Sequence, residues 1–213
     1  RFFFFFTSGH AFFGATPEIL AQVDGTQFHT AALAGSIRRG ANDLEDDALA
    51  ESLWNNPKER HEHALVVNAL YERLNPLAQA LSAPDVPQIY RLSNIQHLYT
   101  PFDGTLPMGT HILNVIEQLH PTPALGGYPR NIALETIQQA ETESRGWYAA
   151  PVGWFDHMGS GQFAVAIRSA VAVGDTARLY AGVGVVAQSD PDQEWDETNL
   201  KFRPVLNALG VTA

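Results

Sequence analysis

The order of the sequence patterns predicts an α+β fold, in which antiparallel sheets pack against helices. Strand-like apolar runs fill residues 2–33, helical periodicity dominates the middle of the chain, and strand patterns return over residues 147–187. Strands grouped in this way favour α+β over the regular alternation of a doubly wound parallel sheet. The connection over residues 75–87 contains Pro and Ala but no Ser/Gly linker, so we treat residues 1–213 as one domain.

The first third of the chain predicts a series of strands. The continuous apolar run of residues 2–6 predicts a strand that is buried on both faces. Asp24-Gly25 is typical of a tight hairpin between two later strands. Glu18 follows Pro17 at the end of an apolar run. Its carboxylate is either a surface group at a strand end or a group beside a pocket, where its pKa would rise.

Two segments that follow the first strands predict a loop and two helices. Residues 33–40 contain small side chains and two Gly, and we expect them to leave the sheet, either close to a ligand or as an ordinary loop. Asn42 and Glu45 then have the spacing of a capping box. Asn56-Pro57 is a favourable start for the next helix.

The centre of the chain combines short elements with one rigid connection. We expect a strand over residues 88–92 and helices over residues 110–119 and 130–139. Residues 120–127 hold two Pro and two Gly, which predicts a fixed loop without regular structure.

The last third predicts strands over residues 147–155, 162–173 and 177–187, joined by Gly/Asp turns. In the middle strand, Arg168 lies on the small-residue face. It either reaches a bound carboxylate with both guanidinium nitrogens or lies in water at a sheet edge. Residues 181–186 could place bare backbone beside a ligand, but they lack the context of a dinucleotide-binding fingerprint.

Acidic side chains recur at helical spacing in two places. A helix that begins near Pro191 would put Glu194, Glu197 and Lys201 on one face, and Glu59 and Glu62 are spaced in the same way. Carboxylates that meet from two helices would suit Mg²⁺, which prefers oxygen ligands. Two solvated acidic faces would show the same spacing.

The composition excludes several classes of function. A formal net charge of −10 argues against binding to nucleic acid or to an anionic membrane surface. No apolar run is long enough to span a membrane, and the absence of Cys excludes disulfides and thiolate chemistry. Arg1 and the Phe run that follows are too short for a signal peptide, and a start without Met suggests a piece of a longer protein.

Several of these segments together resemble the chorismate-utilising enzymes, which include isochorismate synthases, salicylate synthases, anthranilate synthase component I and aminodeoxychorismate synthase. The segments occur in the family's order and span nearly the whole chain, so the resemblance is highly specific. They are Gly14-Ala15-Thr16-Pro17-Glu18, Leu33-Ala34-Gly35-Ser36, Lys58-Glu59-Arg60-His61-Glu62-His63, His120-Pro121-Thr122-Pro123-Ala124, Ala166-Ile167-Arg168, Ala181-Gly182-Val183-Gly184 and Glu194-Trp195-Asp196-Glu197 with Lys201. The resemblance implies a part of the chorismate-binding α/β sandwich.

Two positions distinguish the branches of this family. Ala34 stands where aminodeoxychorismate synthases carry a nucleophilic Lys, and Ala124 stands where anthranilate synthases have Thr. Ala34 therefore means that this covalent route is absent, and the motif His120-Pro121-Thr122-Pro123-Ala124 resembles that of an isochorismate synthase. Residues 60–63 and 100–104 are most similar to the enzymes that make 2,3-dihydroxybenzoate for siderophores, while the menaquinone branch remains open.

The resemblance implies a Mg²⁺-dependent isomerase, in which a water-derived hydroxyl at C2 of chorismate replaces the C4 hydroxyl. Glu18 would be the general acid for the departing hydroxyl, and Mg²⁺ would hold the ring carboxylate. The implied metal ligands are Glu62, Glu194 and Glu197, with Glu59 in support. The implied substrate-binding residues are Gly35, Ser36, His97, Ala124, Tyr148, Arg168, Gly182, Gly184 and Lys201.

One part of the family pattern is missing. The water-activating Lys would precede Glu18 by roughly thirty residues, whereas this sequence has no Lys before Lys58. The chain therefore resembles the C-terminal portion of an isochorismate synthase. Two alternatives remain: a salicylate synthase, and an incomplete fragment that binds Mg²⁺ and chorismate without turnover.

The resemblance also implies the partners. Chorismate is the expected small-molecule substrate, and no glutaminase subunit, nucleic acid or membrane partner is expected. We expect a monomer, and chorismate chemistry in a chain without Cys suits the cytoplasm.

Overall fold

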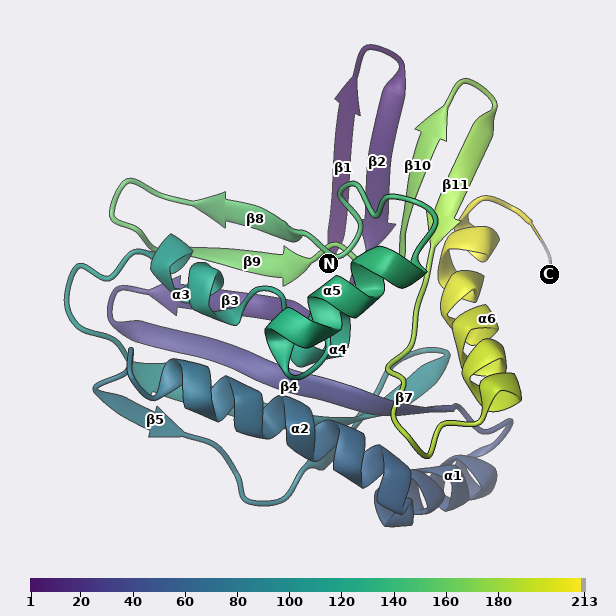
Figure 1. Cartoon of the computed structure of the whole chain (residues 1–213), viewed down its shortest axis with the longest axis horizontal. Helices are drawn as coiled ribbons and strands as arrows, with labels where there is room; N and C mark the ends of the chain where they lie inside the picture. Colours follow the sequence, from purple (N-terminus) through teal and green to yellow (C-terminus); the bar gives the residue numbers. More distant parts are fainter. Residues whose placement is uncertain (212–213) are drawn as a thin grey trace.

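The computed structural model describes residues 1–211 and contains two antiparallel sheets (Figure 1). Six strands of the seven-stranded sheet lie in the order β5-β7-β4-β3-β9-β8, and β6 also pairs with β7. These strands are β3 (Ile19–Asp24), β4 (Gln27–Arg38), β5 (Ala80–Ser82), β6 (Gln88–Arg91), β7 (Ile95–Thr105), β8 (Pro151–Phe155) and β9 (Gly161–Val165). The four-stranded sheet has the order β1-β2-β10-β11, with β1 (Phe2–Thr7), β2 (His10–Ala15), β10 (Ser169–Val173) and β11 (Thr176–Tyr180). The predicted α+β class is confirmed.

The chain crosses between the two sheets at two neighbouring places. Residues 16–18 lead from β2 to β3, and residues 166–168 lead from β9 to β10. Backbone hydrogen bonds join the two crossings: the Ala15 amide donates to the Arg168 carbonyl and the Val165 amide to the Glu18 carbonyl, each at 3.1 Å. The prediction of one strand over residues 162–173 was therefore wrong. The alternating pattern does not reveal the turn at Arg168, which has a φ of 51°.

The segment at residues 33–40 remains in the sheet, and the prediction that it leaves was wrong. β4 continues to Arg38 beside β7, with a register shift between Ala34 and Ser36. Gly35 forms this bulge with a φ of 77°, a conformation that Gly adopts without steric cost. The bulge lies against α2, since a Cβ at Gly35 would be only 3.2 Å from Glu59 Oε2.

Six helices complete the fold within residues 1–211, and the starts of α1 and α2 follow the capping signals. Asn42 and Asn56 accept hydrogen bonds from the first-turn amides of α1 and α2, as predicted. α2 packs its apolar face, which includes Val66, Leu70 and Leu74, against the larger sheet in the main core. The helices are α1 (Asp43–Asn55), α2 (Pro57–Leu74), α3 (Ile112–Leu119), α4 (Pro123–Gly126), α5 (Arg130–Ala140) and α6 (Pro191–Ala208). None of the helices within residues 1–211 is both long and apolar enough to cross a membrane.

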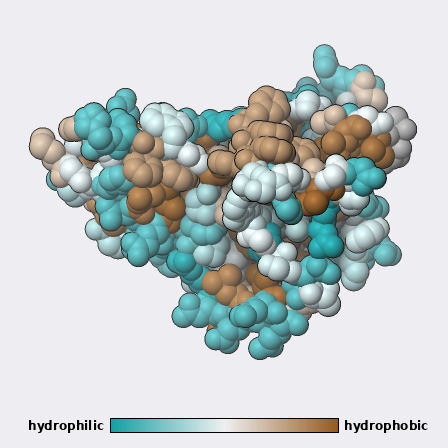
Figure 2. Space-filling view, turned by 90° about the horizontal axis from the view of Figure 1, so that it is seen from above, coloured by the Kyte–Doolittle hydropathy of each residue, from teal (hydrophilic) through white to brown (hydrophobic). Residues whose placement is uncertain are grey.

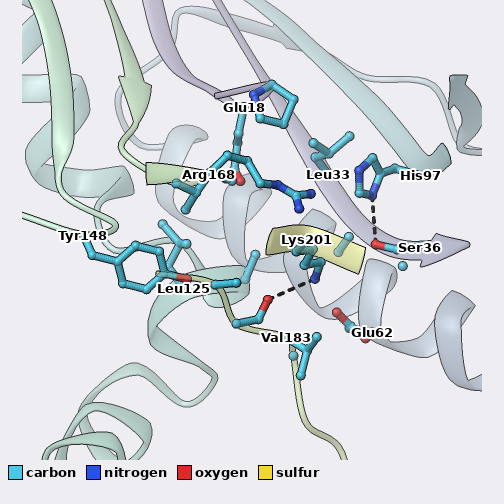
Figure 3. A pocket seen from close by; sticks show the side chains of 18 of the residues that line it. Glu18, Leu33, Ser36, Glu62, His97, Leu125, Tyr148, Arg168, Val183 and Lys201 are labelled. Carbon is cyan, nitrogen blue, oxygen red and sulfur yellow. Dashed lines mark hydrogen bonds between the residues drawn. The ribbon is translucent and has the colours of Figure 1, made fainter. Parts of the chain in front are cut away.

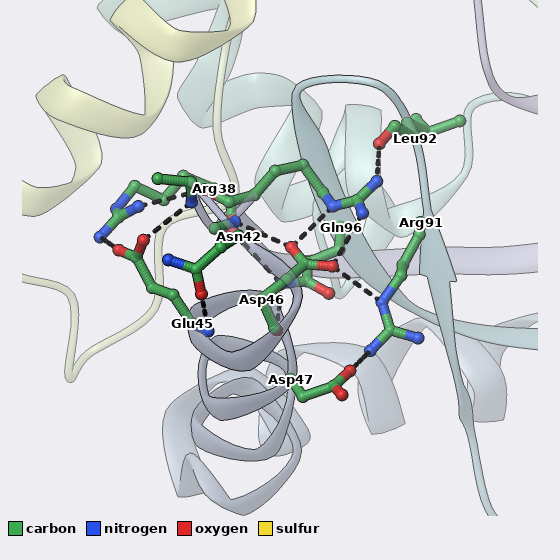
Figure 4. Close-up of polar contacts among 11 residues, drawn as sticks. Arg38, Asn42, Glu45, Asp46, Asp47, Arg91, Leu92 and Gln96 are labelled. Atoms are coloured by element: carbon green, nitrogen blue, oxygen red, sulfur yellow. Dashed lines mark hydrogen bonds and ion pairs between the residues drawn. The ribbon is translucent and has the colours of Figure 1, made fainter.

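An ion-pair network ties α1 to the ends of β4 and β6 (Figure 4). Asp46 accepts two hydrogen bonds of 2.7 Å from Arg39, and its other partners are the Gly40 amide and Arg91. The contacts with Arg39 and Gly40 lower the pKa of Asp46 to about 2. The network fixes α1 and so supports the start of α2, which carries Glu59.

Several element boundaries differ from the sequence predictions. β7 was not predicted at all, and β5 lies within the expected connection at residues 75–87. The short helix α4 interrupts the segment predicted as irregular, because Pro123 suits a first helical turn. Residues 181–190 form no strand, so the predicted strand over 177–187 ends at Tyr180.

The first strand is exposed, which contradicts the prediction that it is buried on both faces. Phe2 is 91% exposed, and Phe4 and Phe6 are each 67% exposed. β1 is the edge strand of the smaller sheet, and nothing within residues 1–211 covers the face that these side chains occupy. Figure 2, which looks down on the tips of the two hairpins, shows hydrophobic residues gathered over this end of the molecule.

Candidate functional site

The two sheet crossings, the β4 bulge and the segment after β11 surround one pocket (Figure 3). All of the predicted site residues except Glu59, Glu194 and Glu197 line it. These three carboxylates lie next to the pocket, in the groove between α2 and α6. Residues from nine separate parts of the chain therefore meet here. The predicted members of the lining are Glu18, Gly35, Ser36, Glu62, His97, Ala124, Tyr148, Arg168, Gly182, Gly184 and Lys201.

Glu18 lies at the β2–β3 crossing with its side chain in the pocket and not at the surface. The residue is 7% exposed, and its backbone amide donates to Thr16 Oγ1 at 3.2 Å. Burial raises the pKa of Glu18 to about 7, although Arg168 and Lys201 act to lower it. A carboxyl group with this pKa is partly protonated near neutral pH and can donate a proton.

Arg168 lies at the other crossing, and its guanidinium points into the pocket. The residue is 6% exposed, which excludes a position in water at a sheet edge. Nη1 is buried and has no hydrogen-bond partner among residues 1–211. Burial lowers the pKa of Arg168, but an Arg keeps its charge in proteins. An unpaired buried cation of this kind favours an anionic ligand.

Aromatic and imidazole side chains complete the walls. Tyr148 stacks on Tyr180, with 5.3 Å between the ring centroids. His97 Nδ1 shares a hydrogen bond of 2.9 Å with Ser36 Oγ, whereas Nε2 is buried without a partner among the described residues. Burial, together with Arg168 and Lys201, lowers the pKa of His97 to about 3. His97 is therefore a neutral hydrogen-bonding group at physiological pH.

A second histidine holds the bulge in place. His63 on α2 donates from Nδ1 to the Ala34 carbonyl at 3.1 Å and accepts at Nε2 from Thr100 Oγ1 at 2.8 Å. Its burial lowers its pKa to about 4. This histidine is thus structural, and it fixes the strand that carries Gly35 and Ser36.

The four predicted metal-ligating carboxylates meet from α2 and α6. Glu59 and Glu194 are buried, at 8% and 7% exposure, and the side chains of Glu62 and Glu197 are 18% and 19% exposed. Burial and the neighbouring charges of Glu59 and Glu197 raise the pKa of Glu62 to about 7. These carboxylates are therefore not two separate solvated faces.

Two lysines lie among these carboxylates. Lys58 Nζ is 2.6 Å from Glu194 Oε1 and 3.0 Å from Glu59 Oε1. Lys201 Nζ is 2.7 Å from Glu197 Oε1 and donates to the Gly182 carbonyl at 3.1 Å. No role for Lys58 follows from the sequence patterns alone. The position of Lys58 directly before Glu59 could have indicated this contact, because a Lys next to paired carboxylates neutralises their charge.

The oxygen donors fit a hard divalent cation in their chemistry. Four carboxylates converge, and one of them resists ionisation because of its neighbours, so a cation would relieve their repulsion. Within residues 1–211, however, no three His, Asp or Glu side chains are close enough to hold a metal ion. Instead, one oxygen each of Glu59, Glu194 and Glu197 forms an ion pair with a lysine.

The glycines after β11 let the backbone approach the carboxylates. A Cβ on Gly184 would lie 2.5 Å from Glu62 Oε1, and one on Gly182 would lie 3.2 Å from the Tyr148 hydroxyl. Any larger residue at Gly184 would displace Glu62. The structure also adds Leu33, Leu125, Arg145, Ile167 and Val183 to the lining. Leu33, Ile167 and Val183 belong to motifs already quoted from the sequence, whereas no quoted motif contains Leu125 or Arg145.

The site combines a buried acid, an unpaired buried guanidinium and a carboxylate cluster, which is typical of an enzyme that acts on a small anionic substrate. Comparison with known proteins makes the class specific. The protein-family profile described as chorismate binding enzyme matches residues 1–210. The chain belongs to the chorismate-binding enzyme family, as the resemblance in the sequence indicated.

Individual relatives are named isochorismate synthases. The chain is 45% identical to isochorismate synthase MenF of Bacillus subtilis over 202 residues, which are 95% of this chain and 43% of the relative. It is 38% identical to isochorismate synthase EntC of Escherichia coli K12 over 95% of this chain and 52% of the relative. The chain thus spans about half the length of the curated relatives that it matches.

Solved structures agree with this assignment. The crystal structure described as a putative 2,3-dihydroxybenzoate-specific isochorismate synthase, DhbC from Bacillus anthracis, superimposes with a TM-score of 0.93 at 39% identity. The match covers 98% of this chain and 57% of that one. Anthranilate synthase component I from Streptococcus pneumoniae also superimposes, with a TM-score of 0.82 at 25% identity over 95% of this chain and 45% of that one. The fold is therefore common to branches with different chemistry.

Proposed function

We propose that this chain carries the acid-catalytic and metal-binding part of an isochorismate synthase, which converts chorismate to isochorismate. The observation that supports this most directly is the pairing of Glu18 and Arg168 in one pocket. One is a buried carboxyl group with a pKa of about 7, and the other is a buried guanidinium nitrogen without a partner among the described residues. Together they offer a proton donor and an anion-binding group.

In the proposed reaction, water adds at C2 of the ring, the double bonds shift, and the C4–oxygen bond breaks. Glu18 gives its proton to the departing C4 oxygen, which leaves as water. Because this step needs the protonated form, the raised pKa of Glu18 suits the role. Arg168 and Tyr148 bind the enolpyruvyl carboxylate, and Lys201 with the backbone of Gly182 and Gly184 contacts carboxylate oxygens.

The remaining proposed site residues shape the ring pocket and hold the metal. Gly35, Ser36, His97 and Ala124 line the ring. Glu62, Glu194 and Glu197 are the proposed Mg²⁺ ligands, with Glu59 in support. The metal would neutralise the ring carboxylate and orient the substrate.

The group that removes a proton from water is the one function without a candidate in this sequence. The chain has two lysines, Lys58 and Lys201, and both pair with carboxylates. Since the relatives are about twice as long, we propose that residues 1–213 are the C-terminal portion of the catalytic domain and that the base comes from outside them. The isolated chain would then bind Mg²⁺ and chorismate but turn over slowly.

The first test is turnover of chorismate with and without Mg²⁺, followed by chromatography of the products. Isochorismate formed only with Mg²⁺ supports the proposal, whereas pyruvate and salicylate would indicate a salicylate synthase. Binding without turnover, abolished by Glu197→Gln, would indicate an assembled site that lacks its base. Absence of both binding and turnover would contradict the proposal for this chain.

We further propose a cytoplasmic monomer that acts without a glutaminase subunit, because Ala124 resembles the non-aminating branch. The named neighbours include both a 2,3-dihydroxybenzoate-specific and a menaquinone-specific isochorismate synthase. Either product branch is therefore compatible with the proposed reaction. Sedimentation of the purified chain tests the monomer.

A further inference from the structure

Lys58 occupies a position for which the proposed reaction has no use. It is the second residue of α2, and its side chain is only 18% exposed. Its ammonium group contacts Glu194 on α6 at 2.6 Å and Glu59 on its own helix at 3.0 Å, and it lies 3.9 Å from Glu62 Oε2. This ammonium is thus the direct ionic link between the two helices that carry the carboxylates.

The fourth carboxylate of the cluster, Glu197, forms an ion pair with the other lysine, Lys201. Each of the four proposed metal ligands therefore has a lysine nitrogen within 4.0 Å, and the sequence contains no other lysine. The two ammonium groups differ in their connections. Lys201 also donates to the Gly182 carbonyl of the pocket wall, whereas all of the ion pairs of Lys58 are to carboxylates.

The chemistry of the lysine side chain suits a replaceable cation. An ammonium group is a compact point charge with three donors, carried on a flexible stem of four carbons. It can neutralise two carboxylates at once and can leave without any movement of the backbone. A guanidinium, with its planar fork, would hold its partners in a more fixed geometry.

We propose that Lys58 is a built-in counter-cation, which holds Glu59 and Glu194 together when no divalent cation is bound and releases them when one binds. This inference rests on the proposed Mg²⁺ site. It explains why no three carboxylates within residues 1–211 are arranged for a metal even though four converge. It also implies that Mg²⁺ competes with Lys58, so that the lysine weakens Mg²⁺ binding while it stabilises the metal-free protein.

The test is a calorimetric titration of Mg²⁺ into the wild-type chain, Lys58→Met and a matched control, Arg178→Met. The control removes one positive charge from an exposed residue whose ion pair is with Glu143 and not with any of the four clustered carboxylates. Lys58→Met should bind Mg²⁺ at least about tenfold more tightly, because a unit charge within a few ångströms of the site is removed. Its melting temperature without Mg²⁺ should fall and should recover when Mg²⁺ is added, whereas Arg178→Met should match wild type in both measurements.

A second measurement follows the metal-dependent change in the wild-type chain and uses a variant only to assign the signals. Reductive methylation with ¹³C-formaldehyde keeps the charge and labels two lysines and the terminal amine, which gives three resonances. Lys201→Arg identifies the Lys201 signal. Saturation with Mg²⁺ should move the Lys58 signal to the position of a solvent-exposed lysine.

The outcomes separate this inference from the proposed function. If Lys58→Met binds Mg²⁺ no more tightly than wild type and the Lys58 resonance stays in place, the lysine is a permanent partner of Glu59 and Glu194 and the inference is wrong. The Mg²⁺ site then still stands, provided that Glu197→Gln abolishes binding. If the wild-type chain, Lys58→Met and Arg178→Met all fail to bind Mg²⁺, the proposed metal site is wrong. The proposed competition between Mg²⁺ and Lys58 is then wrong as well.

Discussion

The pocket and the β1–β2 hairpin depart from the usual distribution of residues in opposite directions. In the pocket, Glu18 and Arg168 are charged residues with exposures of 7% and 6%. In the hairpin, Phe2 and Phe4 are aromatic residues with exposures of 91% and 67%. Charged residues are rarely buried without partners, and large apolar groups on one face are rarely left open.

The two departures are not equally informative. A buried charge without a partner specifies the sign and hydrogen-bonding geometry of what it binds, because desolvation makes any other occupant costly. An exposed aromatic face specifies only that contact with water is unfavourable, and it fits any apolar cover. For this reason the pocket supports a proposal about its ligand, and the hairpin does not.

The largest effect is expected at the acid. In an active protein that contains residues 1–213, Glu18→Gln should lower turnover by about 10²–10⁴-fold, because the departing oxygen loses its proton donor. Chorismate affinity, measured by calorimetry, should change little, since glutamine keeps the size of the side chain. Full turnover by Glu18→Gln would show that burial of this carboxyl serves the fold alone.

The burial of Glu18 should also affect how the free energy of unfolding depends on pH. As pH rises above 4.5, the unfolded chain loses this proton, while the folded chain keeps it until about pH 7. The unfolded state therefore binds fewer protons, and the free energy of unfolding should fall between these pH values, by up to about 3 kcal/mol. His63 and His97, whose folded pKa values are lowered, oppose this fall below about pH 6.5, so the effect of Glu18 is the difference between wild type and Glu18→Gln. In urea titrations from pH 4.5 to 8.5, the stability of wild type relative to Glu18→Gln should decrease as pH rises. Glu143→Gln, which changes an exposed carboxylate, should follow wild type throughout.

A smaller loss is expected at the guanidinium. Arg168→Met should weaken chorismate binding by roughly tenfold to a hundredfold, the usual value of hydrogen bonds to a charged group. Arg178→Met provides the matched control at an exposed position. Equal affinities for the two variants would mean that the buried guanidinium does not contact the ligand.

The hairpin should show the smallest effect. Phe4→Ser should leave the free energy of unfolding within about 0.5 kcal/mol of wild type, because the side chain is 67% exposed. Phe12 on the paired strand is 4% exposed, and Phe12→Ala should cost about 3–5 kcal/mol. A large loss for Phe4→Ser in urea unfolding would mean that the exposed face is covered in solution.

Local chemistry was enough to predict those parts of the fold that depend on neighbouring residues. Asn42, Asn56 and Pro191 start their helices as expected, because capping involves only the next few residues. Asp24-Gly25 likewise joins β3 to β4. The grouping of Glu194, Glu197 and Lys201 on one helix face follows from helical spacing alone.

The remaining differences involve contacts between distant segments. β7 escaped prediction because it buries polar side chains, with Gln96, His97 and Thr100 at 0%, 4% and 1% exposure. The partners of these side chains come from β4, α1 and α2. The Phe run over residues 2–6 was predicted as buried because its side chains are apolar. Apolar character does not show whether another element covers the strand, and here none within residues 1–211 does. Lys58 was overlooked since its partner Glu194 lies more than a hundred residues away.

The paired crossings between the sheets have a consequence for how this scaffold can change in evolution. Backbone hydrogen bonds fix Glu18 relative to Arg168 and involve no side chain that could be lost by substitution. Ala124, Gly182 and Gly184, in contrast, belong to α4 and to the irregular segment after β11. If the proposed roles hold, substitutions in these segments can alter which ring is accepted, while the proposed proton donor and anion-binding group keep their separation. The proposed acid step and the choice of substrate could then diverge independently.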